Sequence, residues 1–236
     1  SRLRTELAWL AAALGAARDA EVLRARLRQT AAQDPLAPLD PASVARIDAD
    51  LAVRQEDALA ALDKVMCDER YHRLLDTLLE AWHEPHVARH AEDLAETVLP
   101  RLAARPYKRL AYGGDGVVGA GQLDPNAADE VWHAVRRNGK RARYAVEAAA
   151  AVLGGEASAL ASALAKVQEL LGEHQDAAVA AQTWLAIANA DPDDHVLATT
   201  AGRLFERERT AVRAARAAFP AAWRAASRRR LTEWMR

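Results

Sequence analysis

Apolar residues recur at three- and four-residue spacing along almost the whole chain, which is the period of an amphipathic helix. Ala, Leu, Arg and Glu dominate the composition, and all four favour helices. The pattern predicts an all-α fold. The expected helices cover residues 2–31, 42–65, 68–83, 86–104, 126–153, 156–189, 193–218 and 221–235.

Three Asp-Pro pairs punctuate this pattern, at residues 40–41, 124–125 and 191–192. Each pair could supply a capping carboxylate followed by a proline in the first turn, where the missing N–H costs nothing. We therefore expect a helix to begin after each of the three pairs.

A nine-residue pattern occurs twice, as LGAARDAEV at residues 14–22 and LGEHQDAAV at residues 171–179. Each copy follows an apolar stripe, continued by Arg18 in one and Gln175 in the other. The stripes are Leu3, Leu7, Leu10 and Leu14, and Leu160, Leu164, Val167 and Leu171. We expect Gly15 and Gly172 to permit close helix approach. The repeat predicts two similar halves related by duplication, residues 1–111 and 124–236, joined by the Gly-rich segment 112–123. Together they would form one domain.

The duplication predicts a feature that the first half lacks. A basic helix segment begins at His133, 39 positions before Gly172, so its counterpart before Gly15 would begin near position −24. We therefore expect that the N-terminal half is truncated at its start and has lost its first basic helix.

The overall charge shows that the protein is not basic throughout. Lys and Arg number 32 against 33 acids, so the formal net charge is −1. A site for a polyanion must then be local.

A single cysteine, Cys67, allows no intramolecular disulfide, and the apolar runs are too short to span a bilayer. These features favour a cytoplasmic protein that does not bind membranes.

The segment 131–147 concentrates positive charge on one side of a helix. With His133 at the centre of a helical wheel, cations and one tyrosine occupy its face, and no acid lies between Glu130 and Glu147. The face consists of Arg136, Arg137, Lys140, Arg141, Arg143 and Tyr144. Ala134, Val135, Ala142 and Val146 gather on the opposite side. Like charges at this spacing repel, so the face predicts an anionic ligand, or acids from other helices, unless it is simply solvated.

Phosphoryl oxygens suit such a face, because arginine and lysine bind them through charge-assisted hydrogen bonds. Nucleic-acid binding is helped by aromatic platforms for the bases, and Tyr144 is the only one near this face besides the apolar Trp132. A phosphate chain without bases therefore fits better, and we expect no specific nucleic-acid partner.

The sequence here resembles the CHAD family, the "conserved histidine α-helical domain". The resemblance rests on His133, Arg136, Lys140, Arg141, Arg143 and Tyr144, followed by Leu171, Gly172 and Asp176. It extends to residues 7–23 and 70–82 in the first half, and so to essentially the whole chain. It implies two similar helical bundles around a central basic groove or pore. It also implies binding of inorganic polyphosphate and association with polyphosphate granules. Asn138 stands where the family often has another basic residue.

With no basic helix in the first half, we expect Arg18 to contribute to the site from there, with Arg73 and Arg70 as further candidates. The run Arg228–Arg230 is interpreted as a solvated helix end. We expect a non-catalytic polyphosphate-binding module, without cofactor.

Other readings stay open. A helical scaffold could dock an acidic protein partner, and a phosphohydrolase could use His133 as nucleophile or general acid. Glu-x-x-His pairs at residues 69–72, 80–83 and 130–133 have the spacing of di-iron bundles, and His86 and His90 could ligate zinc. The neighbouring cations argue against iron and no third zinc ligand is evident, so we expect no metal.

Overall fold

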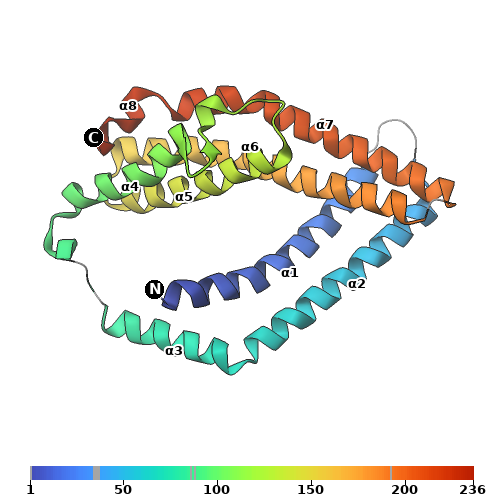
Figure 1. Ribbon diagram of the computed structural model, residues 1–236, viewed down its shortest axis with the longest axis horizontal. Helices are drawn as coiled ribbons and strands as arrows, with labels where there is room; N and C mark the ends of the chain where they lie inside the picture. The colour runs from blue at the N-terminus through green and yellow to red at the C-terminus, as the bar shows by residue number, and fades with distance from the viewer. Residues whose placement is uncertain (1, 34–37, 86, 88, 192) are drawn as a thin grey trace. The chain divides into compact units, whose positions relative to one another are not determined.

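The computed structural model describes residues 2–236 except 34–37, 86, 88 and 192, and the backbone alone at 89 and 90. Helices form almost all of it, which confirms the all-α class (Figure 1). The elements are α1 (Arg2–Ala32), α2 (Pro41–Met66), α3 (Glu69–His83), the 3-10 helix η1 (Arg89–Glu92), α4 (Ala95–Tyr112), β1 (Gly113–Gly114), β2 (Val117–Val118), η2 (Ala120–Gln122), α5 (Asp129–Leu153), α6 (Gly155–Ala190), α7 (His195–Ala226), α8 (Arg229–Thr232) and η3 (Glu233–Met235).

One of the three Asp-Pro pairs caps a helix as expected. The Asp40 carboxylate accepts hydrogen bonds from the backbone N–H of Ser43 at 2.7 Å and from its hydroxyl at 2.8 Å. These bonds hold the pKa of Asp40 below its usual value. The prediction for Asp124 is wrong: its carboxylate accepts from the backbone of Asn126, and α5 begins only at Asp129.

The third pair includes Pro192, which lies outside the described residues. The start of α7 is instead capped by Asp194, which accepts from the backbone N–H of Leu197 at 2.9 Å. A side-chain cap thus exists here, a few residues beyond the predicted one.

Two predicted helix ends are wrong because helices continue through prolines. Helix α4 passes Pro106 and ends at Tyr112, and α7 passes Pro220 and ends at Ala226. A proline within a helix costs about 3 kcal/mol. In both helices side chains beyond the proline are buried, namely Tyr107, Leu110, Trp223 and Ala226. Tertiary packing therefore outweighs the local penalty. The predicted helix over 86–104 also starts too early, since α4 begins at Ala95.

Contacts divide the chain into two compact units, and each is described by itself. Unit 1 comprises residues 1–88 and 180–207, and unit 2 comprises residues 89–179 and 208–236. These units differ from the predicted halves, and the duplication stays a prediction. The Gly-rich segment lies within unit 2, where it forms the β1–β2 hairpin and η2. A Cβ on Gly113 would collide with the backbone of Val117, and its φ is +84°, so this turn requires glycine.

Each unit has its own apolar core. In unit 1 the C-terminal half of α1 packs with α2, the end of α6 and the start of α7. The residues are Leu27, Leu39, Ile47, Leu51, Ala180, Trp184, Ile187, Leu197, Ala201 and Leu204. In unit 2 a larger core joins α4, α5, α6 and the C-terminal part of α7, including Trp132, Leu160, Leu164, Leu171 and Phe219. No helix in the described part of the chain is both long and apolar enough to cross a bilayer.

The two repeated glycines do not do what we expected. A Cβ built on Gly15 or Gly172 meets nothing within 4 Å, so neither position mediates a close helix approach. Gly139 of α5 takes that role instead. A Cβ there would lie 3.0 Å from Gln168 Oε1 and 3.4 Å from Leu171 Cδ1 of α6. The close contact between α5 and α6 therefore favours glycine at this position of α5.

Candidate functional site

Helix α5 places its apolar side in the core of unit 2 and its cations outside it. Trp132, Val135, Gly139, Ala142 and Val146 are buried. Asp129 and Glu130 occupy the first turn, where the helix dipole favours negative charge. Asn138, which departs from the family pattern, is buried on the apolar side, so it is no member of the cationic face.

We call the opposite side the α5 cationic face. It comprises His133, Arg136, Arg137, Lys140, Arg141, Arg143 and Tyr144. Arg137, Arg141 and Tyr144 are exposed, and the others are half-buried. Arg143 donates from Nε to Glu147 at 2.6 Å, a contact that raises its pKa. Among the residues that the structure describes, the other four cations form no ion pair. The charge on this face is therefore largely uncompensated.

One cation of the face, Arg136, has a buried guanidinium nitrogen. The Nε of Arg136 is buried and has no hydrogen-bond partner among the described residues. A buried donor without a partner costs about 1–3 kcal/mol. Arg136 as a whole is half-buried, so it adds its charge to the face while its Nε is closed to solvent.

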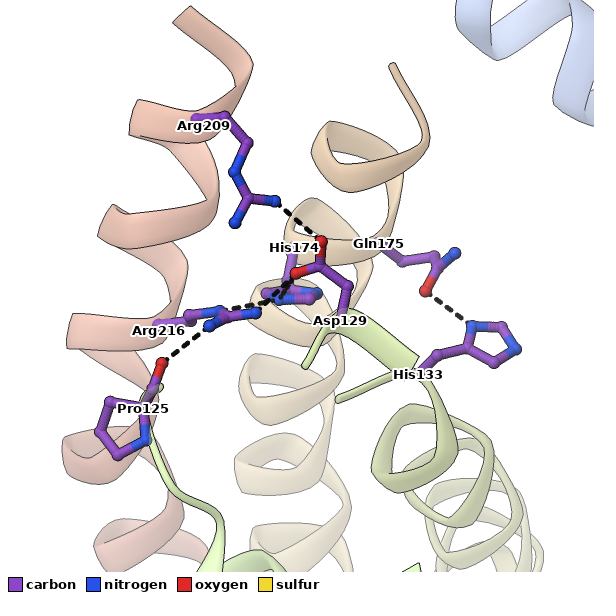
Figure 2. Close-up of polar contacts among 7 residues, drawn as sticks. All are labelled: Pro125, Asp129, His133, His174, Gln175, Arg209 and Arg216. Atoms are coloured by element: carbon purple, nitrogen blue, oxygen red, sulfur yellow. Dashed lines mark hydrogen bonds and ion pairs between the residues drawn. The ribbon is translucent and has the colours of Figure 1, made fainter. Parts of the chain in front are cut away.

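His133 is held in one orientation by Gln175 of α6 (Figure 2). Its Nδ1 lies 2.6 Å from Gln175 Oε1. An amide oxygen only accepts, so Nδ1 carries the proton and Nε2 remains as the second ring position. Gln175, the polar residue that continues the apolar stripe of α6, is thus a positioning residue for the histidine. In the sequence, the one sign of this role is that Gln175 is a polar residue on an otherwise apolar stripe.

Next to His133, Asp129 joins α5 to α7 (Figure 2). Its carboxylate accepts from Arg209 at 2.8 Å and from Arg216 at 2.5 Å. Arg216 also donates to the backbone oxygen of Pro125 at 2.8 Å and lies over the Trp132 ring. Because two arginines bind the half-buried Asp129 carboxylate, the first turn of α5 is held in place. His133 follows directly after that turn.

His174 completes this network from α6. It is fully buried, stacks on Trp132 with ring centroids 4.9 Å apart, and accepts from Arg216 Nε at 3.0 Å through Nε2. Burial and the charge of Arg216 lower its pKa to about 4. His174 is therefore neutral at pH 7, and its 3.4 Å approach to Asp129 is no ion pair. No local pattern in the sequence predicts this network, although His174 follows Leu171 by three positions and so continues a buried stripe.

The first-half candidates lie in unit 1, and their contacts are described within that unit. Arg18 is exposed and pairs with its neighbour Asp19 at 3.1 Å. Arg73 is exposed and pairs with Glu69 at 3.3 Å on its own helix. Arg70 donates to Glu6 at 2.5 Å and lies 4.2 Å from the centroid of the Trp9 ring. Of the three, Arg70 is most clearly engaged in structural contacts.

The metal-site readings gain no support. Among the described residues, no three or more His, Cys, Asp or Glu side chains cluster where they could hold a metal ion. Glu69, one member of the Glu-x-x-His pairs, is bound to Arg73. The His86 and His90 pair lies outside the described side chains.

The CHAD domain family model matches residues 1–185. The chain belongs to the CHAD family. Membership suggests polyphosphate binding as a function at the level of the family.

Relatives of this CHAD protein include the uncharacterized proteins MT2285 and Rv2226 of two Mycobacterium tuberculosis strains. Each is 31% identical over 206 residues, which cover 86% of this chain but 38% of the relative. The chain thus spans well under half of the curated relatives that it matches. Among solved structures, PptA from Streptomyces chartreusis aligns with a TM-score of 0.71 over 94% of this chain and 78% of its own, at 24% identity. That likeness shows a shared fold.

Proposed function

We propose that this chain binds inorganic polyphosphate through the α5 cationic face. The observation that carries the proposal is uncompensated charge: Arg136, Arg137, Lys140 and Arg141 form no ion pair within the described residues, in a protein of net charge −1. Each charge-assisted hydrogen bond to a phosphoryl oxygen contributes roughly 1.5–3 kcal/mol. Family membership supports the same ligand.

A linear polyanion fits the dimensions of this face. From His133 to Tyr144 the helix rises about 16 Å at 1.5 Å per residue, and cations recur along the whole length. Tyr144 is the one exposed aromatic side chain on the face, which offers bases little to stack on. A phosphate chain needs neither bases nor a deep pocket.

The residues would take different parts in binding. Arg137, Lys140 and Arg141 would contact phosphates directly, Arg136 would contribute its positive charge, and His133 would offer Nε2. Arg143 would contribute less, because Glu147 already binds its Nε. Arg18 and Arg73 of unit 1 remain proposed as further contacts. Binding would be non-catalytic and would localise the protein to polyphosphate granules.

A charge-reversal pair tests the site. Arg137→Glu with Lys140→Glu should lower affinity for long-chain polyphosphate at least about 100-fold, because two attractive contacts become repulsive. Arg54→Glu with Lys64→Glu is the matched control: both side chains are exposed on α2, and the change in net charge is the same. Titrations at two salt concentrations, with double-stranded DNA and heparin beside polyphosphate, provide the measurement.

Affinity for polyphosphate should fall steeply with salt and exceed that for DNA. Equal losses in the α5 pair and the α2 control would contradict the placement of the site. Shortening of the polymer during incubation would instead support the phosphohydrolase reading.

A further inference from the structure

Helix α4 carries the same spacing of charged and aromatic residues as the α5 cationic face. Arg101, Arg105, Lys108 and Tyr112 lie at positions 1, 5, 8 and 12 of a twelve-residue stretch, and His133, Arg137, Lys140 and Tyr144 occupy the same positions 32 residues later. An arginine follows the lysine in both, at Arg109 and Arg141. At 100° per residue, each set lies on one helix face.

Burial follows the same register on the two helices. Ala103, Tyr107 and Leu110 of α4 are buried, as are their counterparts Val135, Gly139 and Ala142 of α5. Arg105 and Tyr112 are exposed, as are Arg137 and Tyr144. The buried sides of the two helices therefore correspond, although Lys108 is exposed where Lys140 is half-buried.

Both helices belong to unit 2 and share one core. They pack against each other, and Leu110 Cδ1 lies 4.0 Å from the position of a Cβ on Gly139. Arg109 directly precedes Leu110 on α4, and Lys140 directly follows Gly139 on α5. Lys108 and Arg109 of α4 thus lie near the level of Gly139 and Lys140 of α5.

The charge on α4 is also uncompensated. Arg101, Arg105 and Lys108 are exposed, and none forms an ion pair with any residue that the structure describes. Arg109 differs, because it is bound to Asp115 of the hairpin. Within α4 the one acid, Glu96, lies in the first turn, before the stripe begins. Three free cations on one face are unfavourable without an anionic partner.

We propose that Arg101, Arg105 and Lys108, together with Tyr112, form a second polyphosphate-binding face on unit 2. The inference rests on the proposed function of α5 and extends it. A long polyphosphate that is held by α5 presents further phosphates at high local concentration to α4, so the second contact adds affinity without a second bimolecular step. The protein would then hold one polymer along two helices.

The test compares three charge-reversed pairs of equal net charge. Arg105→Glu with Lys108→Glu should lower affinity for long-chain polyphosphate at least about tenfold relative to the α2 control, Arg54→Glu with Lys64→Glu. The slope of log affinity against log salt should fall by about one for each cation removed. The α5 pair, Arg137→Glu with Lys140→Glu, is measured beside them. Circular dichroism checks helicity, and Arg105→Gln with Lys108→Gln provides a milder variant if the reversal disturbs folding.

The outcomes separate the two proposals. If the α4 pair matches the control while the α5 pair loses binding, the second face is refuted and the first stands. If neither pair differs from the control, the proposed function of α5 is itself overturned. A loss of affinity in both pairs, with the control unchanged, is the result that we expect.

Discussion

The N-terminal halves of α1 and α6 look alike in sequence but differ in the structure. Each carries a stripe of four large apolar residues, the last of which is the leucine of a Leu-Gly pair. On α6 all four stripe residues are buried, whereas on α1 Leu7 and Leu14 are 41% and 48% exposed. Equal periodicity therefore produced a core in one place and a partly solvated surface in the other.

Packing by neighbouring helices makes the difference. The α6 stripe lies in the core of unit 2 with α5, where Gly139 lets the two helices approach closely. In unit 1, α1 contributes to the core mainly through its C-terminal half, where Leu27 packs with Ile47 and Leu51 of α2. A stripe shows which side of a helix can be buried, and the neighbouring helices decide whether it is.

The largest expected effect compares one residue from each stripe. Leu164→Ala should lower the free energy of unfolding by roughly 2–5 kcal/mol, because it removes a fully buried side chain and leaves a cavity. Leu7→Ala should cost less than about 1 kcal/mol, since much of that side chain is already exposed. Urea unfolding followed by helicity measures both. Similar losses would show that the α1 stripe is as well packed as that of α6.

The second prediction uses the residue that most separates the two repeats. Buried His174 of α6 corresponds to Ala17 of α1. Its folded-state pKa of about 4 lies below the ordinary value of 6.5, so the unfolded chain binds the proton more readily between these values. The free energy of unfolding should therefore fall as pH drops from about 6.5 to 4, by up to about 3 kcal/mol from this group.

The variant His174→Gln isolates that contribution, because its amide oxygen can still accept from Arg216. Asp129, Arg209 and Arg216 face the site in both proteins, and other carboxylates titrate equally in both. The difference in unfolding free energy between wild type and variant should shrink toward pH 4. A constant difference across this range would contradict a neutral buried His174.

The smallest expected effects concern the glycines. Gly172→Ala and Gly15→Ala should each stabilise by about 0.5–1 kcal/mol, because alanine favours helix and nothing lies within 4 Å of the new methyl group. Gly139→Ala should destabilise by about 1 kcal/mol, since crowding against Gln168 and Leu171 outweighs that gain. Thermal unfolding midpoints suffice for the comparison. Stabilisation by Gly139→Ala would show that α5 and α6 have room to separate.

Much of the fold could be predicted because it depends on local spacing. Three- and four-residue periodicity identified most of the helices, and the Asp40-Pro41 pair marked the start of α2 correctly. The errors occurred where distant packing decides the outcome. Prolines 106 and 220 lie inside helices because side chains beyond them are buried in the core of unit 2.

The candidate site divides in the same way. The side of α5 that carries the cations followed from helical spacing, and the structure leaves that side outside the core. The network of Asp129, His174 and Arg216 joins residues 42 to 87 positions apart, and no local pattern predicts which of them meet. The spacing of the cations on α4 can also be read from the sequence. Only the structure shows that Arg101, Arg105 and Lys108 are exposed.

The sequence by itself determined the helical class, the cationic side of α5 and the motif that marks the CHAD family, because each depends on residues within a few turns of one another. Only the tertiary structure decided which apolar stripe is buried, which histidine stays neutral and which arginines remain without an acid. Those properties depend on the neighbours that folding brings together, since desolvation and ion pairing act through space rather than along the chain.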